Sequence, residues 1–185
     1  MPHLTAMLFR YRQLTDLMIT DWKELGKQIG SLQDGREFGG DHFARIALQE
    51  VLGQQWIEAT VEHIVAPKAG AELAMNCLRL LHSEKAVQYA YHIYKSSSGE
   101  RASQAVWLIK QIAHPIAVEW VEEFLNDDNV MGWGIGVLDQ LLWGEQIIFD
   151  ARVEKLLSLA EKKSQLKDQV DFIREYIRER NSESR

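Results

Sequence analysis

The chain has 185 residues, of which 46% are apolar and 26% are charged, and its formal net charge is −6. This composition is ordinary for one globular domain, and no apolar run approaches the roughly 18 residues needed to cross a bilayer. The charge is concentrated in residues 41–150, which contain seven basic and fifteen acidic residues, whereas a nucleic-acid-binding surface would need the opposite sign. We therefore expect a single domain, 1–185, that binds neither nucleic acid nor a membrane.

The cysteine count and the first residues bear on the compartment. Cys77 is the only cysteine, so no intrachain disulfide can form, and its apolar neighbours indicate a buried, inert thiol. The apolar residues near the start are interrupted by Arg10 and Arg12, which is unlike the core of a signal peptide. The expected compartment is the cytoplasm.

Residues 1–40 are predicted to form a helical extension followed by a glycine-rich loop. Asp21 and Glu24, three positions apart, suit the start of a helix, and residues 30–40 contain four glycines. Before Asp21, apolar residues recur at helical spacing. They are Leu4, Met7, Leu8, Tyr11, Leu14 and Met18.

From residue 41 to residue 162 the chain repeats itself with a period of about thirty residues. Residues 74–81 return 31 positions later as residues 105–112, and an Ala-Val pair follows both copies. Each unit has two apolar stretches whose spacing predicts helices, joined by a short polar turn. Such short helix pairs can bury their apolar faces only by stacking, so we expect about four stacked, antiparallel pairs. The equivalent positions near the end of each first helix are Leu52, Leu81, Ile112 and Leu142.

Local signals agree with this division into helices. Ser83 precedes Glu84 as a helix cap, and Pro115 suits the first turn of a helix. Residues 163–185 are predicted to form a charged helix that closes the stack, followed by a short tail, with its apolar stripe at Leu166, Val170, Ile173 and Ile177. The predicted fold is all-α, an α-solenoid of antiparallel helix pairs with N- and C-terminal capping helices.

This pattern resembles the HEAT-like α-solenoids, in particular the short-repeat bacterial kind with units near thirty residues. The resemblance covers about two-thirds of the chain. It rests on the spacing of the helix pairs and on the turn of residues 126–130, which contains Asp and ends in Val. Met131 stands where that family often has Arg. Armadillo-like and tetratricopeptide-like stacks are alternatives, although the aromatic and glycine signature of the latter is missing.

The sequence contains no motif of a catalytic or metal site. His-Glu-x-x-His, Glu-x-x-His and paired-cysteine spacings are missing, so neither zinc nor a di-iron centre has its usual ligands. The Gly-x-Ser-x-Gly elbow and the Lys-Ser/Thr of a phosphate loop are also missing. We therefore expect no enzymatic activity, no catalytic residue, no metal and no cofactor.

The residues expected to bind a partner lie mainly between 111 and 151. This stretch contains eight carboxylates and three tryptophans but no Lys or Arg. Because like charges repel, folding alone gives little reason to collect them, whereas a cationic partner would be attracted; a solvated acidic face is the alternative. Tryptophan often dominates binding energy at interfaces, although Trp120 fits the apolar stripe of a core helix. The predicted partner-binding residues are Trp107, Glu119, Glu122, Glu123, Asp127, Asp128, Trp133, Asp139 and Trp143.

Three alternating glycines, at 132, 134 and 136, are the most unusual local feature, since each glycine costs a helix about 1 kcal/mol relative to alanine. One interpretation is that Gly132 and Gly136 allow neighbouring helices to approach closely. The other is a docking groove for a basic side chain on a helix face that combines Gly132, Gly136, Asp139 and Trp143.

These features predict a protein-binding solenoid. Among bacterial proteins it is similar to immunity proteins, which are small, acidic and without catalysis, and which neutralise a cognate, often basic, toxin by covering its active surface. A bilin lyase or chaperone-like protein of the HEAT-like kind, with Trp and Asp in a concave groove, is an alternative, as is a general assembly scaffold. A HEAT-like DNA glycosylase would need a basic face, which the charge disfavours.

Overall fold

The computed structural model describes residues 21–66 and 68–183, and most of these residues are helical. The expected all-α class is confirmed for this part of the chain. Two compact units can be distinguished, with the division between Ala47 and Leu48. The amphipathic stripe expected between Leu4 and Met18 lies outside the described residues.

The described part of the first unit begins with a short helix, α2 (Trp22–Gln28). Its cap is Asp21, whose carboxylate accepts hydrogen bonds from the backbone N–H groups of Lys23 and Glu24 at 3.1 and 3.0 Å. A side chain that accepts from the first free N–H groups of a helix stabilises its start. The helix start predicted at Asp21 is therefore confirmed.

A β-hairpin follows in the segment that was expected to be a plain loop. Strands β1 (Leu32–Gln33) and β2 (Arg36–Glu37) pair antiparallel, so that the first residue of β1 lies opposite the last residue of β2. Asp34 and Gly35 connect them with positive φ angles of 51° and 75°. A two-residue turn of this kind favours Asp-Gly, so the loop prediction missed a local sequence signal.

The second unit, residues 48–183, is built from helices. Helix α3 (Asp41–Leu52) crosses the division between the units. None of the described helices is long and apolar enough to cross a membrane. The elements after α3 are α4 (Gln54–Val65), α5 (Ala71–Leu81), α6 (Glu84–Ser96), α7 (Gly99–Ile112), η1 (Pro115–Trp120), α8 (Val121–Asn126), α9 (Met131–Trp143), α10 (Ala151–Glu161), η2 (Ser164–Leu166) and α11 (Lys167–Glu183).

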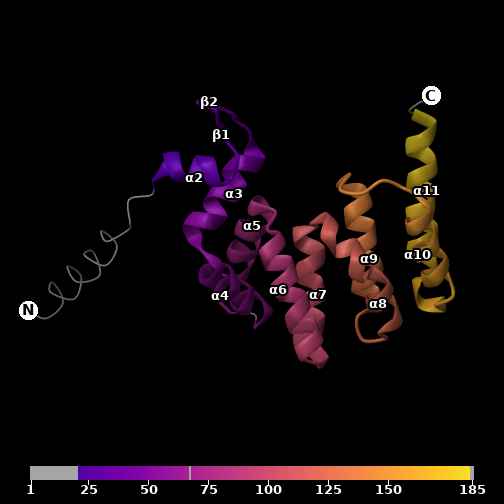
Figure 1. Ribbon diagram of the computed structural model, residues 1–185. Helices are drawn as coiled ribbons and strands as arrows, with labels where there is room; N and C mark the ends of the chain where they lie inside the picture. The colour runs from indigo at the N-terminus through magenta and orange to yellow at the C-terminus, as the bar shows by residue number, and fades with distance from the viewer. Residues whose placement is uncertain (1–20, 67, 184–185) are drawn as a thin grey trace, which may run out of the picture. The chain divides into compact units, whose positions relative to one another are not determined.

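Two sets of helices pack together in the second unit. Helices α5, α7, α9 and α11 contact one another in this order, and we call them the odd-numbered helices. Among the even-numbered helices, α4 contacts α6 and α8 contacts α10, while α6 packs on α7 and α8 on α9. Figure 1 shows the helices of this unit following one another in chain order, from α4 and α5 to α10 and α11. The buried core draws on both sets, with Leu108, Phe124 and Leu138 fully enclosed.

The helix ends repeat at regular intervals. Positive φ angles between 49° and 80° occur at four helix ends. They belong to the residue directly after α3, α5 and α7 and to the second residue after α9. They are 29, 31 and 32 positions apart, at Gly53, His82, Ala113 and Glu145. A left-handed residue is a common way to end a helix. The helices therefore end in the register that the sequence repeat predicted from Leu52, Leu81 and Ile112.

The second helix of each later pair starts with a side chain that accepts a backbone hydrogen bond. Ser83 accepts from Ala86 at 3.1 Å, and His114 Nδ1 accepts from Ile116 at 3.4 Å. Asp150 accepts from the first turn of α10. Ser83, the predicted cap, also donates to the Gln49 amide oxygen at 2.7 Å in a buried contact that joins α3 to the next pair. These caps fix where the chain reverses direction between paired helices.

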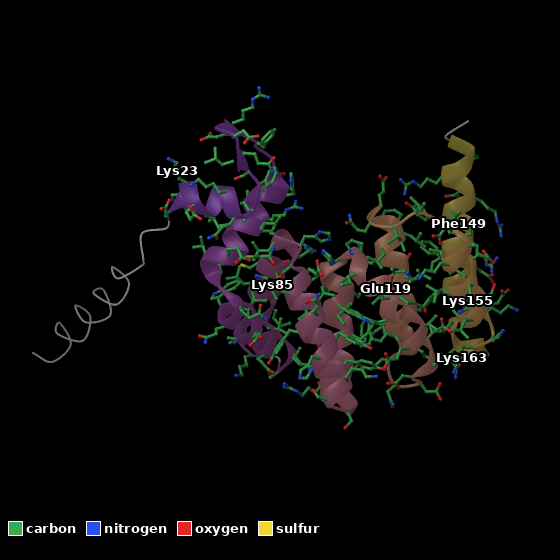
Figure 2. The ribbon with its side chains drawn as sticks, in the orientation of Figure 1. Lys23, Lys85, Glu119, Phe149, Lys155 and Lys163 are labelled. Atoms are coloured by element: carbon green, nitrogen blue, oxygen red, sulfur yellow. The ribbon has the colours of Figure 1, made fainter. Side chains whose placement is uncertain are left out.

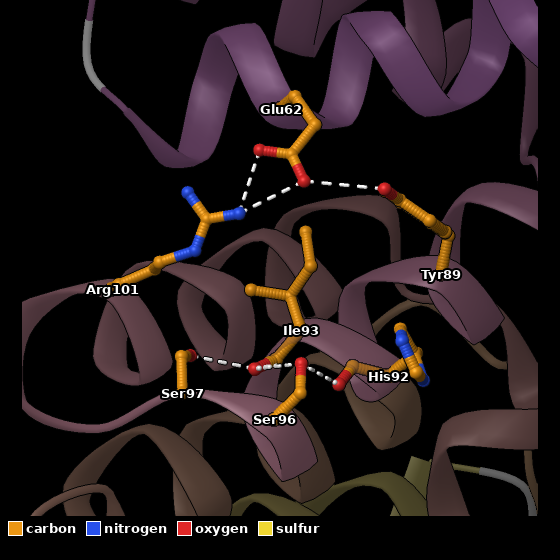
Figure 3. Close-up of polar contacts among 7 residues, drawn as sticks. All are labelled: Glu62, Tyr89, His92, Ile93, Ser96, Ser97 and Arg101. Atoms are coloured by element: carbon orange, nitrogen blue, oxygen red, sulfur yellow. Dashed lines mark hydrogen bonds and ion pairs between the residues drawn. The ribbon is translucent and has the colours of Figure 1, made fainter.

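Polar contacts also join α4 to helices that lie later in the sequence. Arg101 at the start of α7 reaches back to the Glu62 carboxylate on α4, with N–O distances of 2.7 and 2.8 Å. The Tyr89 hydroxyl on α6 donates to the same carboxylate at 3.2 Å, as Figure 3 shows. Arg101 and Tyr89 are 39 and 27 positions from Glu62, so the Tyr89 contact spans about one repeat and the Arg101 contact spans more.

His114, at one of these turns, should make stability depend on pH. Burial and the nearby His82 charge lower the pKa of His114, while Glu84 opposes them, and the two rings lie 5.0 Å apart. Because the folded pKa lies below the unfolded value of about 6.5, the unfolded chain binds more protons in acid. The free energy of unfolding should therefore decrease as the pH falls below about 6.5.

Replacing His114 with asparagine should flatten this pH dependence while keeping an acceptor for the Ile116 N–H. Urea unfolding at several pH values between 5 and 8 measures the slope. His92→Asn, the same substitution at an exposed position on α6, is the matched control. An equal slope in the wild type and His114→Asn would contradict the assignment.

Candidate functional site

Two acidic residues, one on η1 and one on α8, are paired with cations from α10. Arg152 Nη1 lies 2.6 Å from the Glu119 carboxylate, and Lys155 Nζ lies 3.0 Å from that of Glu122. Figure 2 labels Glu119 and Lys155 on these neighbouring elements. The hydrogen bond from Arg152 lowers the pKa of Glu119. The two pairs share a sequence separation of 33 residues, so they link one helix pair to the next.

Two further carboxylates accept hydrogen bonds from α6. Glu123 accepts from the Tyr91 hydroxyl at 2.6 Å and pairs with Lys95, and Asp127 accepts from the Tyr94 hydroxyl at 3.2 Å. Burial opposes ionisation of Glu123, but the hydrogen bonds from Lys95 and Tyr91 outweigh it and lower its pKa. Burial and the bond to Glu123 raise the pKa of Tyr91 to about 12. These carboxylates hold α8 against α6.

The expectation of an unneutralised acidic stretch is therefore wrong for five of its eight carboxylates, which form ion pairs. Asp128 pairs with Lys163 at 3.1 Å, Glu145 pairs with Arg180, and Asp150 caps α10. The stretch lacks Lys and Arg because its cations come from helices before and after it in the sequence. These acids therefore contribute to the fold, because they form contacts between elements that are distant in the sequence.

The predicted tryptophans have different environments. Trp120 stacks on Tyr91, with ring centroids 4.1 Å apart and planes 5° from parallel, so its predicted place at the core is confirmed. Trp107 is partly buried and packs against the core. Trp133 and Trp143 are exposed, with 36% and 61% of their surface accessible. The exposed rings therefore belong to α9.

A groove lies over α9, between α7 and α11. Its volume is about 310 Å³. Trp133 is exposed on one side, and Phe172 of α11, 58% accessible, on the other. The indole N–H of Trp133 donates to Ser103 on α7 at 2.9 Å, which fixes the ring. The other lining residues are Lys110, Gly132, Ile135, Gly136, Asp139, Asp168, Gln169 and Ile173.

The three glycines of α9 have three different surroundings. A Cβ atom on Gly134 would lie 2.7 Å from the Cβ of Phe124, so this glycine lets α8 and α9 approach closely. A Cβ on Gly136 would lie 3.2 Å from the side chain of Lys110, and one on Gly132 would meet nothing within 4 Å. The close helix approach expected at Gly132 and Gly136 is therefore found at Gly134. Gly132 and Gly136 line the groove instead.

Asp139 is one of two carboxylates that line the groove, and the other is Asp168. Asp139 is half-buried, and burial raises its pKa, while the charge of Lys110 opposes this effect. Within residues 21–66 and 68–183, no hydrogen bond or ion pair reaches the Asp139 carboxylate. Lys110 lies over the Trp133 ring, with its Nζ 5.7 Å from the ring centroid. Of the nine predicted binding residues, Trp133 and Asp139 are the two that line this groove.

Trp143 lies outside the groove, although it was expected on the same face. Its ring is 5.0 Å from that of Tyr176 on α11. Tyr176 also lines a separate hollow with Ile148 and Arg180, of about 470 Å³. Trp143 is eleven positions after Gly132, which places it about three turns further along the axis of α9.

The sequence analysis predicted no role for Lys110, Asp168 or Phe172, which also line the groove. Phe172 had a signal, because it falls beside the buried positions Val170 and Ile173 rather than among them. An aromatic residue off the apolar stripe of an amphipathic helix is a candidate for binding. No group of His, Cys, Asp and Glu suited to a metal ion occurs among the described residues.

No protein-family model matches the chain, and comparisons with curated proteins and with solved structures find no match.

Proposed function

We propose that this chain is a protein-binding α-solenoid of the HEAT-like kind, and that its partner docks on the odd-numbered helices around the α9 groove. The regular spacing of the left-handed residues that end its helices supports the solenoid arrangement. So do the polar contacts that span about one repeat, such as Tyr89 to Glu62 and Arg152 to Glu119. Stacked helix pairs offer an extended surface to a partner.

The exposure of Trp133 and Phe172 on the two sides of a glycine-lined groove carries this proposal. Both rings are large and apolar, and neither belongs to the buried core cluster or packs against it. Exposed apolar surface with a charged rim is typical of interaction sites, and Trp is enriched among the residues that dominate interface energies. The groove thus has the composition of a binding site without the residues of a catalytic one.

The partner is proposed to be a basic protein, and a toxin neutralised by occlusion in the cytoplasm is the narrowest form of the proposal. Asp139 and Asp168 line the groove, and the whole chain carries a net charge of −6. Complementary charge accelerates encounter and rejects wrong partners. Covering the active surface of a toxin requires affinity alone, so the protein would act without catalysis.

Replacing both Trp133 and Phe172 with alanine should weaken partner capture by about 30-fold or more, since a hot-spot side chain contributes about 2 kcal/mol. The tagged full-length chain and the variant are compared as baits in lysate of the source cells, with bound proteins identified by mass spectrometry. A captured basic protein is then expressed alone and with the chain, and relief of growth inhibition reports neutralisation.

The matched control is the double change Glu119→Gln and Glu122→Gln, which alters the carboxylates paired with α10. It should retain the partner. If the control loses the partner and the Trp133 and Phe172 variant keeps it, the binding surface lies on the acidic stretch and the groove has no part in it.

A further inference from the structure

We propose that the α9 groove binds one lysine or arginine side chain of the partner protein, with its cationic head at Asp139 and its stem between Trp133 and Phe172. This inference rests on the proposed function and identifies the chemical group that the site recognises. It follows from three features of the groove: a carboxylate that forms no hydrogen bond or ion pair with the described residues, two exposed rings, and the lysine that already lies there.

The first feature is Asp139. A half-buried carboxylate is partly deprived of water, and burial raises its pKa. In the part of the chain that the structure describes, neither a hydrogen bond nor an ion pair compensates this loss. A charged group in this situation gains from a cation that enters beside it. Asp168, at the start of α11, adds a second negative charge to the lining.

The second feature is the pair of rings. The face of an aromatic ring attracts a cation, most strongly when the ring is Trp. The hydrogen bond to Ser103 holds the Trp133 ring in place, so little side-chain entropy is lost when a ligand binds. The long aliphatic stems of Lys and Arg also pack well on apolar rings. Trp133 and Phe172 therefore suit the stem, and Asp139 suits the head.

The third feature is Lys110, which occupies one edge of the groove. Its stem crosses Gly136, where any side chain would crowd it, and its Nζ lies over Trp133. The position shows that this indole accepts a cation. Its charge faces the Asp139 carboxylate without forming an ion pair, so Lys110 competes with an incoming cation. The lining has two carboxylates and one ammonium group, a balance that still favours a basic ligand over an acidic one.

Short capped peptides test the inference on the full-length chain. The probes are acetyl-Gly-Arg-Gly-amide, its lysine counterpart and a glutamine counterpart that keeps the stem but lacks the charge. The indole N–H signal of Trp133 in a ¹⁵N-labelled protein reports binding, and Trp133→Phe assigns that signal. The two cationic peptides should shift the signal in a saturable way, and the glutamine peptide should not.

Three variants give expected changes in the affinity for the arginine peptide. Asp139→Asn should weaken it about tenfold, because the head loses its counter-charge. Gly132→Leu should weaken it about tenfold or more by filling the groove, in a place where a Cβ meets nothing within 4 Å. Lys110→Gln should strengthen it about threefold by removing the competing charge. Gain of affinity is a result that general damage to the fold would not give.

Equal binding of the glutamine peptide, or unchanged affinity in Asp139→Asn, would overturn the inference. The proposed function fails separately. If a partner is captured through Trp133 and Phe172 but not affected by Asp139→Asn, the binding role stands and the cation site does not. If the peptides bind through Asp139 but no neutralised partner is found, the cation site stands and the proposed function does not.

Discussion

Phe124→Ala should lower the free energy of unfolding by about 3–5 kcal/mol, the usual cost of removing a buried phenylalanine from a packed core. Phe124 is fully buried, and its ring meets that of Tyr94 edge-on, with centroids 5.0 Å apart. Gly134 packs against its Cβ from the other side. The side chain therefore joins α6, α8 and α9, which belong to three successive helix pairs. Urea unfolding followed by circular dichroism gives the free energy and the m-value.

The control is Phe172→Ala, which removes the same ring from an exposed position. It should change stability by no more than about 0.5 kcal/mol. A loss below about 1 kcal/mol for Phe124→Ala would mean that α6, α8 and α9 do not meet at this ring. The two variants also separate stability from binding, since Phe172 is proposed to contact the partner.

The helices and their ends could be predicted because their signals are local and recur. Leu81 and Ile112 were aligned from the sequence, and each is followed by a left-handed residue, His82 or Ala113. A period near thirty with helical spacing inside each unit leaves few alternatives. The hairpin at Asp34 and Gly35 was missed although its turn signal is equally local.

The ion pairs were not predicted because charge was counted only within one stretch. Glu119 and Arg152 are 33 positions apart, as are Glu122 and Lys155. Residues one repeat apart become neighbours when helix pairs stack, so the correct comparison is between equivalent turns of successive units. Once the repeat was known, the spacing of the acids in α8 and the cations in α10 was a usable signal.

The groove could be anticipated only in part. Gly132, Gly136 and Asp139 share one helix, so their common face follows from helical geometry. Lys110 and Phe172 come from α7 and α11, and no local pattern brings those helices to the two sides of α9. Trp143 does not line the groove, because it lies about three turns along α9 from Gly132.

Alanine substitutions at the three glycines of α9 should change stability in different directions. Gly134→Ala should destabilise the protein by about 1–3 kcal/mol. The added Cβ atom would overlap the Cβ and the backbone of Phe124, and the packed backbone of α8 cannot move away without loss of stability. Gly132→Ala should stabilise by up to about 1 kcal/mol, the gain in helix propensity where no clash offsets it. Gly136→Ala should fall between them, since the flexible Lys110 stem can shift. Thermal and urea unfolding of the three single variants measures these differences.

The order of the three variants separates packing from binding on one helix. If helix propensity alone mattered, all three substitutions would stabilise by a similar amount, which would contradict the close approach of α8 and α9. If Gly132→Ala destabilised the protein, the space beside that glycine would already be filled. The expected order of stabilities would therefore show that Gly134 is needed for the packing of α8 on α9 and that Gly132 is not needed for packing. A glycine that weakens its own helix and touches no neighbouring helix is best explained by the open groove it lines.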